Sequence, residues 1–363
     1  MKKKIPTSHT TTTIMTTTTA TNDSDNMVLE TSSTQVLPSH HMDYVNHVAF
    51  DVYGRRVATC SGDRFVRVWD LGSDGSWSLS GQWTAHRGAV SQLSWCHPEF
   101  GTLMATCATP DQEVKVWEER PSSSSNKVWL ERAQLTEARR PVTCLEFAPR
   151  HFGLQLATGS ADGVCRIYEA VDLMNVAQWP LQGSILTASR TPLTCLSWCT
   201  GRFEPPTLAL GGNHLLGIWR YNSNVREWQN ILQLDQSNIL DVAWAPNVGR
   251  RFHWIAAAQN GGPLRVYQLS RPPRRQQQQQ QQQTSSSSGD TQQPSIPLLE
   301  LESTTELTTS NDEQCWRCQW NVTGTVLASS GDGGLVRLWK HGGAEWKCVS
   351  EIYGDLTETA MQS

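Results

Sequence analysis

Short runs of alternating apolar and polar residues recur along most of this chain. The first clear example is residues 57–70, VATCSGDRFVRVWD, where a Ser-Gly-Asp-Arg turn separates two apolar runs. After the turn, Val66 and Val68 alternate with Arg67, which is the period-2 pattern of a half-buried β-strand. The pattern therefore predicts a β-hairpin.

The hairpin pattern occurs six times, each time with an aromatic residue at its end. The terminal aromatics lie 48 to 51 residues apart, except for one interval of 72 that contains residues 271–288, RPPRRQQQQQQQQTSSSS. The terminal aromatics are Trp69, Trp117, Tyr168, Trp219, Tyr267 and Trp339. Each unit also has a small residue, which we expect to let neighbouring sheets approach closely: Ala58, Ala105, Ala157, Ala209, Ala257 and Ala328.

A further apolar segment follows each terminal aromatic and predicts a fourth strand. These segments are residues 77–83, 128–135, 176–181, 227–234, 297–301 and 346–352. Four strands in a unit of about 40 to 50 residues are typical of a β-propeller blade. We therefore predict an all-β propeller of six four-stranded blades over residues 41–355.

Two segments lack this pattern. Residues 1–40 are rich in Thr and Ser and contain few large apolar side chains, so we expect a disordered tail, with residues 27–30 as a candidate strand. Residues 271–296, rich in Gln and Ser, are expected to form a disordered insert between blades five and six.

Composition narrows the function. The net charge of −4 argues against direct nucleic-acid binding, which needs a basic field. No apolar run approaches the length of a membrane span, and the basic start of the chain leads into a Thr tract rather than the apolar core of a signal peptide. Ten cysteines without such a signal indicate reduced thiols in an intracellular protein.

The six units resemble WD repeats. In that family a turn Asp six residues before the terminal Trp bonds to a His from the preceding loop. The resemblance implies that a set of such residues stabilises the blades: Asp63, Asp111, Asp162, His86, Trp69 and Trp117. A His-Asp pair is also half of a catalytic triad, but no nucleophile motif accompanies it, so we predict no catalytic residue and no enzyme activity.

The pair Cys315 and Cys318 has the spacing of a zinc knuckle or a redox pair. A four-ligand zinc site needs a second such pair, and none stands at suitable spacing. Val, Leu and Ile fill the corresponding positions of the other units, which indicates two core cysteines. The sequence thus predicts neither a metal nor a cofactor.

The predicted strand count bears on how the ring closes. A WD propeller usually closes when the start of the chain completes the last blade, but here every blade has its own fourth strand. If six blades keep the geometry of a seven-bladed ring, a gap remains between the first and the sixth. Strands of another chain can dock at such an open edge. Candidates for a strand in that gap are Met27, Val28 and Leu29.

Longer phrases narrow the resemblance to one family. These are residues 48–70, HPEFG at 97–101, and residues 147–179, 245–258 and 320–340. They resemble the nucleoporins of the Seh type, the Sec-thirteen homologues. The resemblance implies a scaffold subunit of the Y-shaped outer-ring complex of the nuclear pore, an open propeller that accepts a seventh blade from an α-helical scaffold nucleoporin. It also implies contacts with other outer-ring nucleoporins and, in many organisms, membership of a coat-like complex on the lysosome or vacuole that regulates TOR signalling.

Three alternatives stay open at this point. One is a vesicle-coat propeller of the Sec-thirteen type, which has the same open architecture. Another is a WD-repeat reader of short peptides. The third is an enzyme that depends on Cys315 or His86.

Overall fold

The computed structural model describes residues 11–16, 33–121, 127–187, 190–235, 237–271, 299–308, 314–332, 334–343 and 345–353. The chain divides into two compact units, Met1–Gln134 and Leu135–Ser363, and each is described by itself.

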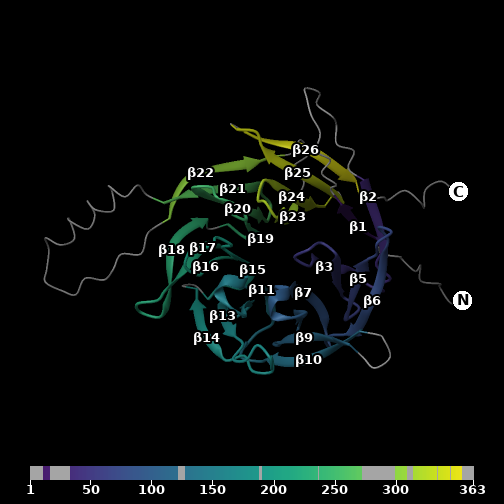
Figure 1. Cartoon of the computed structure of the whole chain (residues 1–363). Helices are drawn as coiled ribbons and strands as arrows, with labels where there is room; N and C mark the ends of the chain where they lie inside the picture. The colour runs from purple at the N-terminus through teal and green to yellow at the C-terminus, as the bar shows by residue number, and fades with distance from the viewer. Residues whose placement is uncertain are drawn as a thin grey trace, which may run out of the picture. The chain divides into compact units, whose positions relative to one another are not determined.

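The first unit contains a two-stranded sheet and two four-stranded blades (Figure 1). The two-stranded sheet consists of β1 (Thr11–Thr16) and β2 (Ser33–Pro38). Blade one consists of β3 (Val45–Phe50), β4 (Arg56–Ser61), β5 (Phe65–Leu71) and β6 (Trp77–Thr84). Blade two consists of β7 (Ala89–Trp95), β8 (Leu103–Thr109), β9 (Val114–Pro121) and β10 (Lys127–Leu135), with the 3-10 turn η1 (Pro98–Phe100) after β7.

The second unit contains four blades. Blade three consists of β11 (Val142–Phe147), β12 (Gln155–Ser160), β13 (Val164–Glu169) and β14 (Leu181–Leu186), with η2 (Arg150–Phe152) after β11. Blade four consists of β15 (Leu193–Trp198), β16 (Thr207–Gly212), β17 (Leu215–Asn222) and β18 (Glu227–Asp235). Blade five consists of β19 (Ile239–Trp244), β20 (Phe252–Gln259), β21 (Leu264–Ser270) and β22 (Glu300–Leu307). Blade six consists of β23 (Cys315–Trp320), β24 (Val326–Gly331), β25 (Leu335–His341) and β26 (Trp346–Tyr353).

The strands of every blade follow one another in chain order, and we name them A, B, C and D. All described pairings are antiparallel. The predicted fold class, a propeller of six four-stranded blades, is confirmed. Whether the ring is open stays a prediction. In the part of the chain that the structure describes, no helix is long and apolar enough to cross a membrane.

Two predicted fourth strands were misplaced. Strand D of blade three is β14 rather than residues 176–181, and strand D of blade five is β22 rather than residues 297–301. In blade three the error arose because Val176 and Trp179 are buried although they lie in a turn that precedes β14. The Trp179 ring packs on Phe147 with centroids 6.2 Å apart, and its Nε1 donates to the Val176 carbonyl at 3.0 Å. Apolar residues can thus fill the core from a turn.

The expectation of a disordered tail over residues 1–40 is also corrected in part. Strands β1 and β2 lie within this range and pair antiparallel, with Thr11 opposite Pro38 and Thr16 opposite Ser33. The β-branched Thr residues favour an extended backbone, and the pairing of the two strands satisfies their backbone N–H and C=O groups. The polar composition of the segment does not reveal this pairing. Met27, Val28 and Leu29 lie outside the described residues, as do residues 272–296 of the Gln-rich insert.

Each blade has two different faces. Residues that oppose one another across an antiparallel ladder project to the same side. In blade one, Ala58 is opposite Val68 on what we call the small face. Val57 is opposite Trp69 on the other side, which we call the aromatic face.

The small face of one blade packs on the aromatic face of the next. In the first unit, Ala58 and Val68 of blade one share a core cluster with Leu93 and Trp117 of blade two. The clusters of the second unit repeat this arrangement between blades three and four, four and five, and five and six. The core is therefore a series of layers between blades rather than one central cluster.

One predicted small residue was off by one position. The register pairs Ala256 with Val266 on the small face of blade five, whereas Ala257 pairs with Arg265 on the aromatic face. Because residues 256–258 are all Ala, the sequence does not reveal which one faces which side. The small residues do permit close approach: a Cβ added to Gly211 of blade four would lie 2.5 Å from the Cys195 sulfur and 2.9 Å from Ile239 of blade five.

Hydrogen bonds also join neighbouring blades. In three places a Trp at the end of strand A donates its Nε1 to a strand A carbonyl of the preceding blade. These bonds are Trp95 to Ala49 at 3.0 Å, Trp198 to Glu146 at 3.2 Å and Trp320 to Ala243 at 3.1 Å. A carbonyl satisfied across a partly buried layer fixes the rotation of one blade on the next.

Glu146 is a half-buried residue whose carboxyl group lies in such a layer. Its Oε2 accepts the Trp198 N–H at 3.0 Å. Burial, with the nearby Asp241 carboxylate as a smaller cause, raises the pKa of Glu146 to about 8 despite that bond. At pH values between the ordinary pKa of a Glu and this value, the folded chain binds more protons than the unfolded chain. The free energy of unfolding therefore falls as the pH rises through this range.

We expect Glu146→Gln to remove this pH dependence, because an amide keeps the acceptor oxygen and does not ionise. The difference in unfolding free energy between variant and wild type should grow in favour of the variant from pH 5 to pH 8, by at most about 1.4 kcal/mol per pH unit. Urea unfolding at several pH values measures it. Parallel curves for the two proteins would show that the carboxyl group is not the cause.

Candidate functional site

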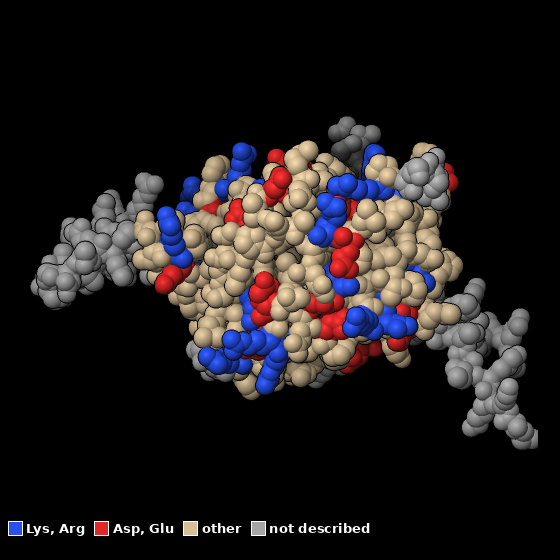
Figure 2. Space-filling model, turned by 90° about the horizontal axis from the view of Figure 1, so that it is seen from below, with Lys and Arg blue, Asp and Glu red and all other residues tan. Residues whose placement is uncertain are grey.

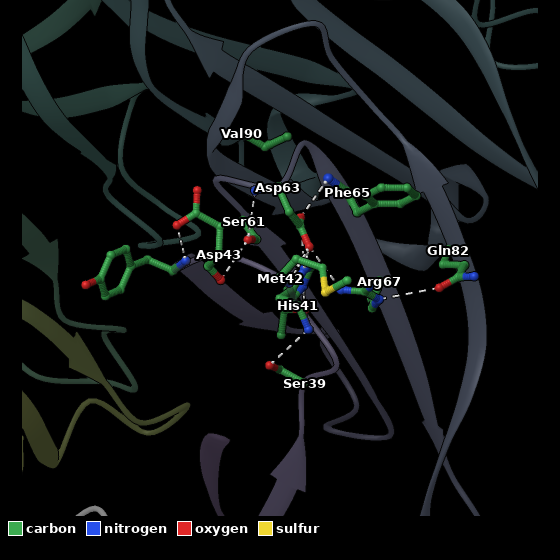
Figure 3. Close-up of polar contacts among 12 residues, drawn as sticks. Ser39, His41, Met42, Asp43, Ser61, Asp63, Phe65, Arg67, Gln82 and Val90 are labelled. Atoms are coloured by element: carbon green, nitrogen blue, oxygen red, sulfur yellow. Dashed lines mark hydrogen bonds and ion pairs between the residues drawn. The ribbon is translucent and has the colours of Figure 1, made fainter. Parts of the chain in front are cut away.

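His41 and Asp63 form a buried pair on blade one (Figure 3). The His41 Nδ1 lies 2.9 Å from Asp63 Oδ2, and its Nε2 lies 2.8 Å from the Thr59 hydroxyl. Arg67 approaches the same carboxylate at 3.4 Å. The loop before strand A is thereby tied to the turn between strands B and C.

The backbone completes the site around Asp63. The Met42 N–H donates to Oδ2 and the Phe65 N–H to Oδ1, each at 3.0 Å. Burial opposes ionisation of this carboxyl group, but these bonds and the one from His41 outweigh it and lower the pKa of Asp63. Burial lowers the pKa of His41, so the imidazole is held as a neutral hydrogen-bonding group. The arrangement of the pair is that of a structural site, because the hydrogen-bonding groups of both side chains already have partners within the blade.

Sequence reasoning missed His41. It precedes Asp63 by 22 residues, close to the 25 that separate His86 from Asp111. That spacing was the available signal. It was overlooked because His41 stands at the edge of a segment whose composition predicts disorder.

Blade two places His86, Asp111 and Trp117 in one network, together with Thr106. His86 Nδ1 lies 3.2 Å from Asp111 Oδ2, and its Nε2 lies 2.8 Å from the Thr106 hydroxyl. That hydroxyl accepts the Trp117 Nε1 proton at 2.9 Å. If Nδ1 carries the imidazole proton, each group in this chain has a partner.

His86 and Asp111 also form, with Glu113, a group whose geometry allows metal ligation. The ammonium group of Lys115 lies 3.7 Å from Glu113 and 3.0 Å from Glu131. Burial, followed by the charge of Lys115, lowers the pKa of His86. A cation of the chain itself therefore supplies the positive charge beside these carboxylates, and both His86 nitrogens already have partners.

Blade three replaces the His with other partners. Asp162 forms an ion pair with Arg166 at 2.8 Å and accepts the Arg139 N–H at 3.2 Å. Although burial opposes ionisation, bonds from Arg166 and Ser160 lower the pKa of Asp162 to about 2. Asp162 thus occupies in blade three the turn that corresponds to that of Asp63 in blade one, but different donors bind its carboxylate.

The two blades that end in Tyr use a carboxylate instead of a hydroxyl. The Tyr168 hydroxyl donates to Glu137 at 2.9 Å, and the Tyr267 hydroxyl donates to Asp235 at 2.7 Å. A phenol extends beyond the position of an indole N–H. Its carboxylate partner comes from the loop before strand A for Tyr168 and from the last residue of the preceding strand D for Tyr267. The Tyr267 hydroxyl also accepts a bond from Gln259 of strand B at 3.3 Å.

The cysteines are placed as core residues. Cys315 and Cys318 are buried, and their sulfurs donate to the carbonyls of Arg317 and Ala256 at 3.5 and 3.7 Å. Burial raises the pKa of Cys315 to about 12 and that of Cys318 well above its usual value. All ten cysteines of the chain are free thiols, and nine of them are buried. Metal binding and redox exchange need a thiolate, which these surroundings disfavour.

Blade faces are unequally covered in the two units. On the aromatic face of blade one, Phe50 is 40% exposed, whereas its counterpart Phe147 in blade three is 7% exposed. On the small face of blade six, Ala328 and Leu338 are half-buried. Their counterparts in blades one to five are at most 2% exposed: Ala58, Val68, Ala105, Val116, Ala157, Ile167, Ala209, Ile218, Ala256 and Val266.

Comparison with known proteins assigns the chain to a class first. The family described as WD domain, G-beta repeat matches residues 31–70, 131–169 and 302–340. A solved chain of the "Crystal Structure of Mitotic Checkpoint Complex" aligns with a TM-score of 0.60 at 15% identity, covering 86% of this chain and 79% of that one. The likeness concerns the fold alone. The chain is a WD-repeat β-propeller.

Curated relatives narrow this to one family. Nucleoporin SEH1-A of Xenopus laevis is 39% identical over 336 residues, which cover 88% of each chain. Nucleoporin SEH1 of Danio rerio is 40% identical, covering 88% of this chain and 87% of the relative, and that of Homo sapiens is 38% identical, covering 88% of each. The chain belongs to the nucleoporin SEH1 family, as the resemblance predicted.

We expect Thr106→Val to destabilise blade two, because it removes the hydroxyl that joins His86 to Trp117. Leaving two buried polar groups without this partner costs about 1 to 3 kcal/mol. Thermal unfolding measures the effect, and Thr106→Ser, which keeps the hydroxyl, is the matched control. Equal melting temperatures for the Val variant and the wild type would exclude a stabilising role for this network.

Proposed function

We propose that this chain is a non-catalytic scaffold subunit of the outer-ring complex of the nuclear pore. In this role it binds an α-helical scaffold nucleoporin that supplies strands to the propeller, and it supports pore assembly and nucleocytoplasmic transport, including that of mRNA. Membership of the nucleoporin SEH1 family supports a place at the nuclear envelope. It also favours this function over the vesicle-coat and peptide-reader alternatives.

The small face of blade six is the observation that carries the proposal. In blades three, four and five, this face is buried under the next blade. In blade six, Ala328 and Leu338 are half-buried, and Gln319 beside them is exposed. This is the one small face whose Ala and branched residue are not fully covered among the described blades.

A partner blade fits this face by the same packing that operates inside the chain. Its large apolar side chains would contact Ala328 and Leu338 as Leu196 and Trp219 contact the small face of blade three. Apolar area removed from water contributes about 25 cal/mol per Å². An interface the size of a blade layer is of the large, apolar kind found in permanent complexes.

The charge distribution agrees with a protein partner. On the face drawn in Figure 2, acidic and basic side chains are interspersed. Nucleic-acid binding needs a basic field, whereas this chain carries a net charge of −4. The exposed turns then remain for other outer-ring nucleoporins. By analogy with the family, we extend the proposal to the coat-like complex on the lysosome or vacuole that regulates TOR signalling.

We expect Leu338→Lys to abolish a one-to-one complex with the co-expressed helical scaffold nucleoporin while the chain stays folded. The half-buried site tolerates a lysine stem in the free chain, but its ammonium group would be buried without a partner in the complex. Size-exclusion chromatography with light scattering measures the complex, and circular dichroism checks the fold.

Two controls sharpen this test. Val322→Lys changes a turn residue of the same blade that is 83% exposed, and we expect it to leave the complex intact. Ile218→Lys changes the corresponding, fully buried position of blade four and should unfold the chain. A Leu338→Lys protein that still binds its partner as the wild type does would contradict the proposed binding face.

A further inference from the structure

The loops at the two ends of the second unit expose different side chains. In an antiparallel blade the A–B and C–D loops lie at one end, which we call the A–B end, and the B–C and D–A loops lie at the other. The described loops at the A–B end are residues 148–154, 170–180, 199–206, 223–226, 245–251, 271, 321–325, 342–343 and 345. Their exposed large apolar side chains are Val171, Leu173, Met174, Phe203, Val225, Val248 and Val322. The described loops at the other end contain no exposed large apolar residue.

The A–B end is one continuous surface, because contacts join the loops of neighbouring blades there. Three contacts make these links: the His151 ring of blade three bonds to the backbone of Gly201 in blade four, Glu204 of blade four lies 3.4 Å from His253 Nε2 of blade five, and Arg250 of blade five donates to the Gly324 carbonyl of blade six at 2.7 Å. The exposed apolar side chains of different blades therefore belong to the same surface.

Positive charge accompanies these apolar side chains. The described loops of the A–B end contain three carboxylates, Asp172, Glu204 and Glu345, and twice as many arginines: Arg150, Arg202, Arg226, Arg250, Arg251 and Arg271. All of these arginines except Arg250 are exposed. The Glu204 side chain is 10% exposed and pairs with Arg271 and, at 3.5 Å, with Arg220. The A–B end therefore attracts anions, although the net charge of the whole chain is −4.

The two most exposed apolar side chains, Met174 and Phe203, are carried by hydrogen-bonded loops. Met174 is 89% exposed, and its backbone N–H donates to Asp172 Oδ1 at 2.8 Å. Phe203 is 93% exposed in a turn where the Glu204 N–H donates to the Gly201 carbonyl at 3.1 Å. Large apolar side chains that the loops hold in water in this way mark an interaction surface.

The chemistry of this surface fits a lipid bilayer best. Anionic head groups would pair with the arginines while the apolar side chains reach the acyl boundary, so both kinds of side chain would find partners. A nucleic acid would bind the arginines but leave side chains such as Met174 in water. A protein partner would need a separate hollow for each apolar side chain, because they come from different loops, whereas a fluid bilayer accepts them wherever they lie.

We propose that the A–B end of the second unit binds the surface of membranes that contain anionic phospholipids. In this state the exposed arginines contact the head groups, and Met174 and Phe203 insert between them. The binding is peripheral and leaves the small face of blade six to the scaffold nucleoporin. The inference goes beyond the proposed function, because it assigns a second surface and a different class of partner.

Flotation of the full chain with vesicles tests this inference. We expect the chain to float with vesicles of equimolar phosphatidylcholine and phosphatidylserine, and much less with phosphatidylcholine alone. The double variant Arg202→Glu, Arg251→Glu should weaken binding about tenfold or more. The matched control is Arg139→Glu, Arg140→Glu, which makes the same charge change in an exposed loop at the other end and should bind like the wild type. Circular dichroism checks that each variant is folded.

A second measurement separates insertion from attraction by charge alone. In a Cys348→Ser background, which removes the one exposed native thiol, Phe203→Cys carries an environment-sensitive dye. We expect the dye emission to shift to shorter wavelength when phosphatidylserine vesicles are added, because the dye enters an apolar layer. The same dye on Leu186→Cys, a 54% exposed position at the other end, should show no shift.

Several results would overturn the inference. A wild-type chain that floats with neither kind of vesicle would do so. Equal loss of binding in the two double variants would show attraction by net charge rather than a defined surface. A dye at position 203 that does not respond to vesicles would exclude insertion, and a shift on binding of the scaffold nucleoporin instead would assign the surface to a protein partner. None of these results contradicts the proposed scaffold function, which depends on the small face of blade six.

Discussion

The covering of each blade face by the next blade is the constraint on which the structure depends. A four-stranded sheet with two apolar faces cannot leave either one in water without losing much of its stability. Here the small face of one blade, with its Ala and a branched residue, accepts the aromatic face of the next. Trp bonds such as that from Trp198 to Glu146 then fix the alignment of the layer.

The same constraint explains where the chain is incomplete. Blade six has a small face with half-buried Ala328 and Leu338, and blade one has an aromatic face that Leu37 covers in part. A repeat protein must cap its terminal faces or bind something there. The chain caps one face partially with β2. The His-Asp networks of blades one and two tie the loop before strand A to the turn between strands B and C.

Much of this could be predicted from the sequence, because the period of the repeats and the alternation within strands are local signals. The six blades followed from them, whereas the turn positions of Asp63, Asp111 and Asp162 were implied by the resemblance to WD repeats. The misplaced strand D of blade three had a tertiary cause, since Trp179 fills the core from a turn. Strand β2 and the role of His41 could not be predicted from composition. Their ordered structure depends on contacts with blade one rather than on the apolar content of the segment itself.

Thiol labelling at the small face of blade six tests the central claim most directly. In a Cys348→Ser background, which removes the one exposed native thiol, Ala328→Cys should react quickly in the free chain and at least about tenfold more slowly in the complex with the scaffold nucleoporin. Ala256→Cys, at the matching covered position of blade five, should react slowly in both. Equally fast labelling of Ala328→Cys in the free chain and in the complex would contradict the account.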